Sequence, residues 1–159
     1  MNAEVTYRRA RLGDLRAIAV MEREYFGRHA FGPGMLLYLV LNAGEGFMVA
    51  EAEGQVVGYI VVRRESVRRA RAELPTFAVR EDMRGRAIGS TLLSQALGYL
   101  ERIGVQRVIL QVSVRNPRAK ALYERFGFAV ERTLPGYYGS GEDAHLMARR
   151  LSGADAEAD

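Results

Sequence analysis

The chain has 159 residues, with 48% hydrophobic and 26% charged residues, which is typical of one globular domain with a sizeable core. It contains no cysteine and two histidines, so disulfides, thiolate metal sites and a cysteine nucleophile are excluded and no metal centre is expected. The net charge is +4, and because residues 152–159 carry three acidic side chains, residues 1–151 hold +7. Any catalytic chemistry must therefore use carboxylates, tyrosine, hydroxyls, arginine and backbone groups.

The composition also limits the partners. No apolar run approaches the roughly 20 residues that span a membrane, and residues 1–10 lack the apolar stretch of a signal peptide. We therefore expect a cytoplasmic protein with no membrane partner. Of the 23 basic residues only Lys120 is a lysine, and the arginines are scattered without interleaved aromatic residues, so no specific nucleic-acid partner is expected. The sequence leaves the oligomeric state open.

The first half of the chain predicts a strand, two helices and a hairpin. Residues 5–10 predict the strand, and Asp14 is expected to cap a helix. The apolar face of that helix comprises Leu15, Ile18, Met21 and Tyr25. Residues 35–41 predict a second helix, and Glu53-Gly54 predicts the turn between two apolar strands. We interpret the arginine-rich residues 63–71 as a solvated loop or hairpin end rather than a binding patch.

The second half interleaves strands and helices. The expected strands are residues 73–79, 105–114, 128–133 and 142–151, and the expected helices begin at Ile88 and at the Asn116-Pro117 cap. Gly127 suits a left-handed helix end, and residues 134–141 are interpreted as the last loop. The whole order predicts an α/β fold with a mixed sheet of about seven strands and about four helices. We expect one domain over residues 1–151, followed by a disordered acidic tail at 152–159.

The stretch "REDMRGRAIGSTLL" lies between a predicted strand and a predicted helix. The first amides of a helix lack intrahelical acceptors, and the helix dipole favours an anion beside them. Gly85 and Gly89 allow close approach of the backbone, and Arg84 and Arg86 can add charge-assisted contacts. The stretch is neither a Walker loop nor Gly-x-Gly-x-x-Gly, so by itself it fits a phosphate site and a plain turn about equally.

Two motifs in order make residues 74–128 resemble the core of the GNAT acyltransferases, which bind acetyl-CoA. The first motif, Arg/Gln-x-x-Gly-x-Gly/Ala, reads Arg84, Gly85, Arg86, Ala87, Ile88 and Gly89. The second matches at Asn116, Ala119, Tyr123, Gly127 and Phe128. The resemblance implies a GNAT fold, with amides of residues 85–90 around the CoA pyrophosphate and residues 77–79 paired with the pantetheine arm. The implied cofactor-binding residues are Phe77, Ala78, Val79, Arg84, Gly85, Arg86, Ala87, Ile88, Gly89, Ser90, Asn116 and Tyr123.

One residue departs from that pattern, since Ala87 stands where the family usually has glycine. Its methyl group either pushes the backbone away from the pyrophosphate or simply suits the first turn of a helix. We expect weaker, but not abolished, CoA binding.

The resemblance also implies a catalytic residue. Tyr123 occupies the position of the family's general acid, which protonates the CoA sulfur; the alternative is that it only packs in the core. Asn116 has two compatible roles, as a helix cap and as a residue near CoA. Because the chain has no cysteine, an acetyl-cysteine intermediate is impossible and the amine must attack directly in a ternary complex.

The segment "GYYGSGEDAHLM", residues 136–147, resembles the protein N-terminal acetyltransferases of the ribosomal-protein-alanine and archaeal types. The resemblance implies that Tyr137 and Tyr138 bind the backbone of the acceptor peptide; the alternative is packing at a strand end. At the subfamily's base position stands Gln111, which at most holds a water because an amide cannot act as a base. Candidate replacements by residue type alone are Glu24, Glu73 and His145, and Glu24 is also a candidate substrate-binding residue.

We therefore predict an acetyl-CoA-dependent N-acetyltransferase that acts on the α-amine of protein N-termini. An α-amine with a pKa of about 7.7–8.0 is far easier to deprotonate than a lysine with a pKa of about 10.4. The first alternative is an acetyltransferase for a small amine such as a polyamine, an amino acid or an aminoglycoside. The second is a non-catalytic module that binds acyl-CoA or nucleic acid.

Overall fold

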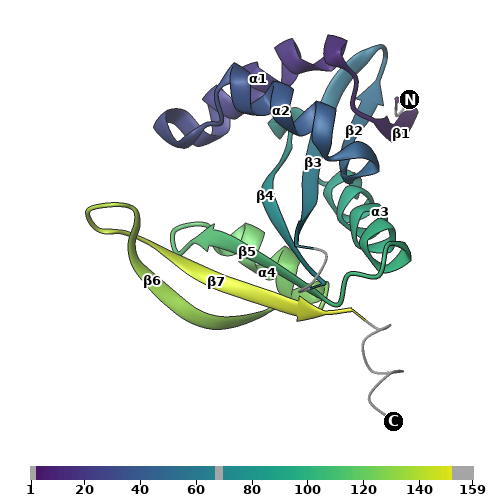
Figure 1. The fold of residues 1–159 in the computed structure, drawn as a ribbon. Helices are drawn as coiled ribbons and strands as arrows, with labels where there is room; N and C mark the ends of the chain where they lie inside the picture. The colour runs from purple at the N-terminus through teal and green to yellow at the C-terminus, as the bar shows by residue number, and fades with distance from the viewer. Residues whose placement is uncertain (1–2, 67–69, 152–159) are drawn as a thin grey trace. The chain divides into compact units, whose positions relative to one another are not determined.

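The computed structural model describes residues 3–66 and 70–151, which form seven strands and four α-helices (Figure 1). In chain order these are β1 (Val5–Arg9), α1 (Leu15–Phe26), α2 (Pro33–Asn42), β2 (Phe47–Ala52), β3 (Gln55–Ser66), β4 (Arg71–Val79), α3 (Ile88–Arg102), β5 (Arg107–Ser113), α4 (Pro117–Arg125), β6 (Ala129–Gly139) and β7 (Glu142–Arg150). The predicted number and order of elements are confirmed.

The strands form one mixed sheet in the order β1-β2-β3-β4-β5-β7-β6. Strands β1/β2, β2/β3, β5/β7 and β6/β7 pair antiparallel, whereas β4 and β5 pair in parallel from Arg71–Glu73 to Arg107–Ile109. A parallel pair needs a long crossover connection, and α3 supplies it between β4 and β5. The predicted mixed α/β sheet is therefore confirmed.

The chain divides into two compact units, which we describe separately. Unit 1 comprises Met1–Val62 and Thr76–Tyr99, and unit 2 comprises Arg63–Pro75 and Leu100–Asp159. Strands β3 and β4 each contribute residues to both units. The single domain over residues 1–151 stays a prediction, and the acidic tail at 152–159 lies outside the described residues.

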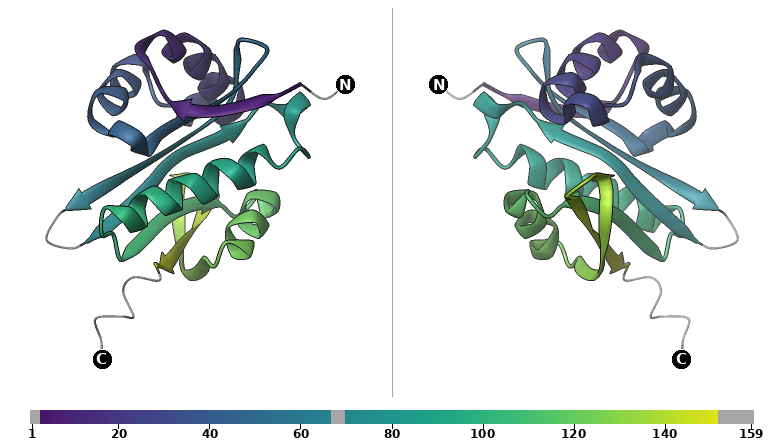
Figure 2. Two further views of the ribbon diagram at one scale, coloured as in Figure 1. Left: turned by 90° about the vertical axis from the view of Figure 1, so that its right-hand side faces the viewer. Right: turned by 90° about the vertical axis from the view of Figure 1, so that its left-hand side faces the viewer.

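The core of unit 1 lies between the helices α1 and α2 and one face of β2–β4, and α3 covers the other face (Figure 2). It includes Ile18, Met21, Leu36, Leu39, Phe47, Val49, Tyr59, Val61 and Ala78. On the α3 face, a Cβ built at Gly58 would lie 3.3 Å from Leu92 and 3.2 Å from the Ala78 carbonyl oxygen, so glycine allows the helix to approach the sheet closely. The apolar faces predicted from the sequence therefore pack in the core.

A buried carboxylate interrupts this core. Glu22 on α1 is 1% exposed and accepts hydrogen bonds from Tyr59 Oη (2.5 Å), Thr76 Oγ1 (2.8 Å) and the Phe31 amide (3.1 Å). These donors belong to β3, β4 and the connection that follows α1. Because a buried polar group must be hydrogen-bonded, this cluster fixes four segments of unit 1 against one another.

Asp14 does not cap α1 as predicted, because its side chain accepts no hydrogen bond from that helix. Its carboxylate instead accepts two hydrogen bonds from the Arg8 guanidinium, both of 2.8 Å, and one of 2.7 Å from the Arg11 amide. The hydrogen bonds from Arg8 lower the pKa of Asp14. The sequence pattern could not show this, because Arg8 comes from the preceding strand.

The arginine-rich segment fits the hairpin end that the sequence predicted, whereas the segment predicted as the last loop is largely strand. The arginine-rich segment contains the end of β3 and the start of β4, joined by the ion pairs Arg63–Glu73 (2.7 Å) and Arg71–Glu65 (2.5 Å), and its residues 67–69 lie outside the described residues. Opposite charges across neighbouring strands stabilise such pairing. Strand β6 likewise continues through most of residues 134–141, with Gly139 paired with Glu142.

Ionisation of Tyr59 makes the stability of this core depend on pH in the alkaline range. Burial and the neighbouring Glu22 carboxylate raise the pKa of Tyr59 above its ordinary value of 10. Above pH 10 the unfolded chain releases this proton, whereas the folded state keeps it. The contribution of Tyr59 to the free energy of unfolding is therefore complete below pH 10 and is lost as the pH rises above it. We expect the unfolding free energy to fall above pH 10 by up to about 1.4 kcal/mol per pH unit for this group. Chemical unfolding at pH 8–11 measures the slope, and Tyr59→Phe should remove this component; an unchanged slope would contradict the assignment.

Candidate active site

The turn between β4 and α3 belongs wholly to unit 1. A 3-10 turn over Glu81–Met83 is followed by two left-handed residues, Gly85 (φ 81°) and Ala87 (φ 61°), and α3 begins at Ile88. The Ala87 carbonyl accepts hydrogen bonds from the Thr91 amide (3.0 Å) and hydroxyl (2.8 Å). The predicted arrangement of strand, tight turn and helix N-terminus is confirmed.

Ala87 is not a first-turn helix residue, because its φ of 61° lies in the left-handed region. That region costs an L-residue with a Cβ about 1–2 kcal/mol relative to a right-handed conformation, whereas glycine adopts it freely. The conformation therefore calls for glycine, and alanine occupies it under strain.

The two arginines of the turn have different surroundings. Arg84 donates from Nε to the Val79 carbonyl (3.1 Å), and its guanidinium lies over the Tyr25 ring, 5.0 Å from the centroid. Arg86 is exposed beside the N-terminus of α3. Protein contacts thus fix Arg84, whereas Arg86 presents its charge to solvent.

The end of β4 alternates between buried and half-buried residues. Ala78 belongs to the core cluster of unit 1, while Phe77 and Val79 are half-buried on the opposite face of the strand. The Arg80 amide donates to the Val57 carbonyl (2.7 Å), so pairing with β3 continues to the start of the turn. This places the predicted pantetheine-binding residues directly before the predicted pyrophosphate-binding turn.

Tyr137 and Tyr138 lie beside the main chain of Gln111 in unit 2, which also contains Tyr123. Tyr123 on α4 is 6% exposed and packs edge-on against Phe128, with ring centroids 5.8 Å apart. The Tyr138 hydroxyl donates to the Gln111 carbonyl (3.4 Å), and its ring meets the Tyr137 ring edge-on at 4.9 Å. The predicted peptide-binding tyrosines therefore contact each other and the main chain at the predicted base position, while Tyr123 packs against Phe128.

The pKa values of two of these phenols are raised. Burial, and next to it the interaction with Tyr138, raises the pKa of Tyr123. Burial and Tyr137 raise the pKa of Tyr138 to about 12. Both groups are protonated near neutral pH and can only donate or accept hydrogen bonds there.

The remaining predicted residues are spread over both units. Asn116 caps α4 as expected, since its Oδ1 accepts from the Ala119 amide at 3.1 Å. Glu24 is exposed on α1, Glu73 pairs with Arg63, and His145 Nδ1 lies 3.4 Å from Thr133 Oγ1. Glu73 and His145 thus each have a partner of their own.

Two polar side chains of unit 1 make contacts that the sequence did not predict, those of Glu22 and Tyr25. Tyr25, assigned there to the apolar face of α1, is half-buried, and its hydroxyl accepts from the Glu81 amide at 2.8 Å. The position of Glu22, four residues after Ile18 on the same face, was an available signal, since a carboxylate on an apolar face needs internal partners.

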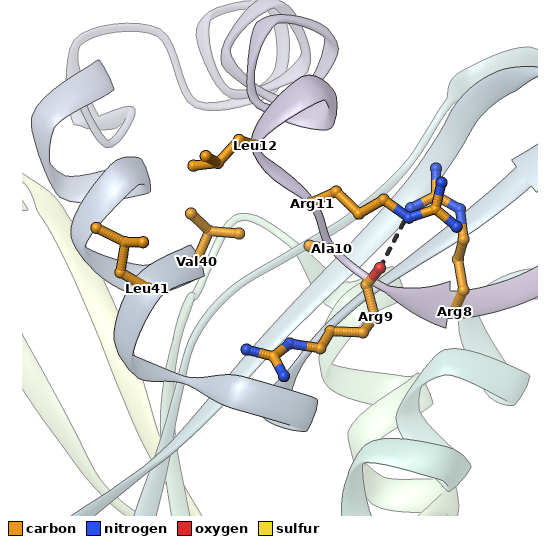
Figure 3. A pocket seen from close by; sticks show the side chains of 7 residues that line it. All are labelled: Arg8, Arg9, Ala10, Arg11, Leu12, Val40 and Leu41. Atoms are coloured by element: carbon orange, nitrogen blue, oxygen red, sulfur yellow. Dashed lines mark hydrogen bonds between the residues drawn. The ribbon is translucent and has the colours of Figure 1, made fainter.

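A separate hollow of about 530 Å³ in unit 1 contains none of the predicted site residues (Figure 3). It is lined by Arg8, Arg9, Ala10, Arg11, Leu12, Val40 and Leu41. Within residues 3–66 and 70–151, no three His, Cys, Asp or Glu side chains are grouped as metal ligands, and no helix is long and apolar enough to cross a membrane.

Comparison with known proteins decides the family. The model of the acetyltransferase (GNAT) family matches residues 14–128, which is more than half of the chain. This chain belongs to the GNAT family. It is 33% identical to the N-alpha-acetyltransferase of Saccharolobus solfataricus over 93% of this chain and 94% of that relative.

Solved structures agree with this assignment. Ard1 from Thermoplasma volcanium superposes with a TM-score of 0.84 at 28% identity, covering 92% of this chain and 97% of Ard1. The ribosomal-protein-S18-alanine N-acetyltransferase from Escherichia coli gives a TM-score of 0.78 at 25% identity, covering 94% and 95%. The GNAT fold is confirmed, and the protein is an acetyl-CoA-dependent N-acetyltransferase.

The turn of this GNAT protein fits the phosphates of acetyl-CoA. No heavy atom outside the neighbouring residues lies within 4 Å of a Cβ built at Gly85, so the backbone is open to a ligand there. The N-terminus of α3 and the exposed Arg86 supply positive potential beside that opening. These features suit a pyrophosphate.

The left-handed conformation of Ala87 predicts that glycine is preferred at this position. Ala87→Gly should relieve the left-handed strain and raise the unfolding free energy by up to about 1 kcal/mol, because the greater freedom of glycine in the unfolded chain offsets part of the gain. CoA affinity should rise as well, since the methyl group leaves the turn. Calorimetric titration with CoA and chemical unfolding measure both effects. Unchanged affinity would show that the methyl group does not weaken binding, and Ala96→Gly in α3 is the control that should only destabilise.

Proposed function

We propose that this enzyme transfers the acetyl group of acetyl-CoA to the α-amine of protein N-termini, and that it does so in the cytoplasm. The main support for this proposal is that unit 2 contains Tyr123, Tyr137 and Tyr138, with Tyr138 bonded to the main chain of Gln111. Unit 2 combines a buried phenol with a 49% exposed tyrosine ring, so it offers hydrogen-bonding groups for a peptide and a candidate acid. The similarity to an archaeal N-alpha-acetyltransferase supports the choice of amine.

The reaction needs no covalent enzyme intermediate. The neutral amine attacks the thioester carbon, a tetrahedral oxyanion forms, the carbon–sulfur bond breaks, and the amine loses one proton while the CoA thiolate gains one. Since the chain has no cysteine, the acetyl group passes directly from sulfur to nitrogen.

We propose that Tyr123 stabilises the leaving group, the CoA thiolate. Its pKa is raised, so it stays protonated near neutral pH and donates a hydrogen bond to the thiolate as the carbon–sulfur bond breaks. A free thiol has a pKa of about 8.5, lower than that of this phenol. Because the phenol is the weaker acid, Tyr123 stabilises the thiolate chiefly through this hydrogen bond, and a proton that it does transfer is regained from the one that the amine releases.

The choice of an α-amine also removes the need for a strong base. At pH 7.5 about a third of an α-amine is neutral, compared with about one lysine side chain in a thousand. Gln111 cannot remove a proton, but it can hold a water that does. We propose this role for Gln111, and peptide-backbone binding for Tyr137 and Tyr138, with Glu24 as a further substrate contact.

Tyr123→Phe tests the catalytic assignment. We expect kcat to fall by about a hundredfold, the lower end for loss of general-acid catalysis, because only the hydroxyl is removed. CoA affinity and the circular dichroism spectrum should be retained. Tyr99→Phe, which removes a phenol from α3, is the control and should keep kcat; an equally active Tyr123→Phe enzyme would reduce Tyr123 to a packing role.

The substrate assignment has a direct test. The protein and acetyl-CoA are incubated with peptides that have a free N-terminus and an internal lysine, with the same peptides carrying an N-terminal formyl group, and with small amines. Mass spectrometry locates each acetyl group. We expect acetylation of free α-amines alone, whereas modification of blocked peptides or small amines with free N-termini untouched would overturn the proposal.

A further inference from the structure

One side chain of α1 holds both ends of the turn that precedes α3. The Tyr25 hydroxyl accepts a hydrogen bond of 2.8 Å from the amide of Glu81, the first residue of the 3-10 turn. The face of the same ring lies under the guanidinium of Arg84, the first residue after that turn, at 5.0 Å. Tyr25 therefore bridges the two ends of a segment to which it is not close in sequence.

Arg84 extends the bridge to the end of β4. Its Nε donates to the Val79 carbonyl at 3.1 Å while its guanidinium stacks on Tyr25. A cation over an aromatic face is attracted by the ring, and the planar guanidinium suits that stacking. The strand end, the turn and α1 are thus joined through one arginine and one tyrosine.

The turn needs such support because few of its residues are buried. Met83, 6% exposed, anchors its middle, whereas Glu81, Asp82, Gly85 and the residues up to Ala87 are exposed. Two of its residues are left-handed, one of them an alanine. An exposed and strained segment gains most from side chains that restrict it to one conformation.

The position of Tyr25 is itself fixed. Three residues earlier on α1, the buried Glu22 accepts hydrogen bonds from Tyr59 on β3 and Thr76 on β4. These bonds hold α1 in register with the strand that leads into the turn, and shifting the helix would leave a buried carboxylate without its donors. The Tyr25 hydroxyl therefore meets the Glu81 amide in a preset geometry.

We propose that Tyr25 is a positioning residue of the acetyl-CoA site, which preorganises the turn of residues 80–87 through Glu81 and Arg84. The inference rests on the assignment of this turn to the CoA pyrophosphate. It makes Arg84 a support of the turn rather than a phosphate ligand, and leaves the backbone amides and Arg86 to meet the phosphates. Preorganisation lowers the cost of binding, so its loss appears in affinity for CoA and not in the chemical step.

The test compares Tyr25→Phe, which keeps the ring under Arg84, with Tyr25→Leu, which removes ring and hydroxyl together. We expect Tyr25→Leu to weaken CoA binding about tenfold by calorimetric titration and to raise the KM for acetyl-CoA, with kcat retained at saturation. Tyr25→Phe should lose only about threefold, because the net effect of one exposed hydrogen bond is small. Tyr38→Phe, which removes an exposed phenol from α2, is the matched control and should bind CoA as the unaltered enzyme does.

A double variant tests the path through Arg84. If Tyr25 acts through that residue, Tyr25→Leu combined with Arg84→Met should lose less affinity than the two single losses multiplied together. Affinity within twofold of the unaltered enzyme for Tyr25→Leu, or fully multiplicative losses, would overturn the proposal. If Tyr25→Leu does not fold, the other two variants test the proposal. A threefold loss of affinity for Tyr25→Phe and a loss of similar size for Arg84→Met would support the positioning role, and unchanged affinities would overturn it.

The same titration separates this inference from the proposed function. An unaltered protein that binds no CoA would overturn both. An unaltered protein that binds CoA and acetylates α-amines, with Tyr25 variants of equal affinity, would overturn the positioning role alone.

Discussion

The buried carboxylate of Glu22 is the constraint on which unit 1 depends. It is 1% exposed in an otherwise apolar core, and it is stable there because three donors from β3, β4 and the α1–α2 connection satisfy it. An unsatisfied buried polar group costs several kcal/mol, so each donor must keep its place. The helix, two strands and a connection are therefore fixed together more specifically than hydrophobic packing alone would fix them.

That fixed frame supports a turn that is poorly stabilised by itself. Gly85 and Ala87 are left-handed, and the turn is mostly exposed, yet in the role we propose it presents the N-terminus of α3 to a pyrophosphate. In that role the backbone has to stay open to the ligand, so core packing cannot stabilise its conformation. The strain at Ala87 is a local cost that the rest of unit 1 offsets.

Unit 2 contributes a different kind of chemistry. Burial raises the pKa values of Tyr123 and Tyr138, which keeps both phenols protonated near neutral pH and makes them hydrogen-bond donors rather than bases. This matches a reaction in which the acceptor amine is partly neutral without help. The absence of a carboxylate or imidazole at position 111 is then consistent with an α-amine substrate, for which a strong base is dispensable.

The sequence by itself determined the elements, their order and the cofactor motif. Helical and alternating periodicity are local properties, and so are the turn at Glu53-Gly54 and the cap at Asn116, because each depends on residues a few positions apart. The family motifs predicted the acetyl-CoA turn and the role of Tyr123 for the same reason, since their spacing is read along the chain.

Only the tertiary structure decided which side chains and segments met between different elements. Asp14 was expected to cap a helix, but its carboxylate accepts hydrogen bonds from Arg8, and residues 134–139 were expected in a loop but belong to β6. Tyr25 was placed in the core from periodicity, yet its hydroxyl reaches Glu81, 56 residues away. Periodicity reports which face a residue occupies, but not which polar group stands opposite, because that partner comes from another element whose placement depends on the packing of the whole unit.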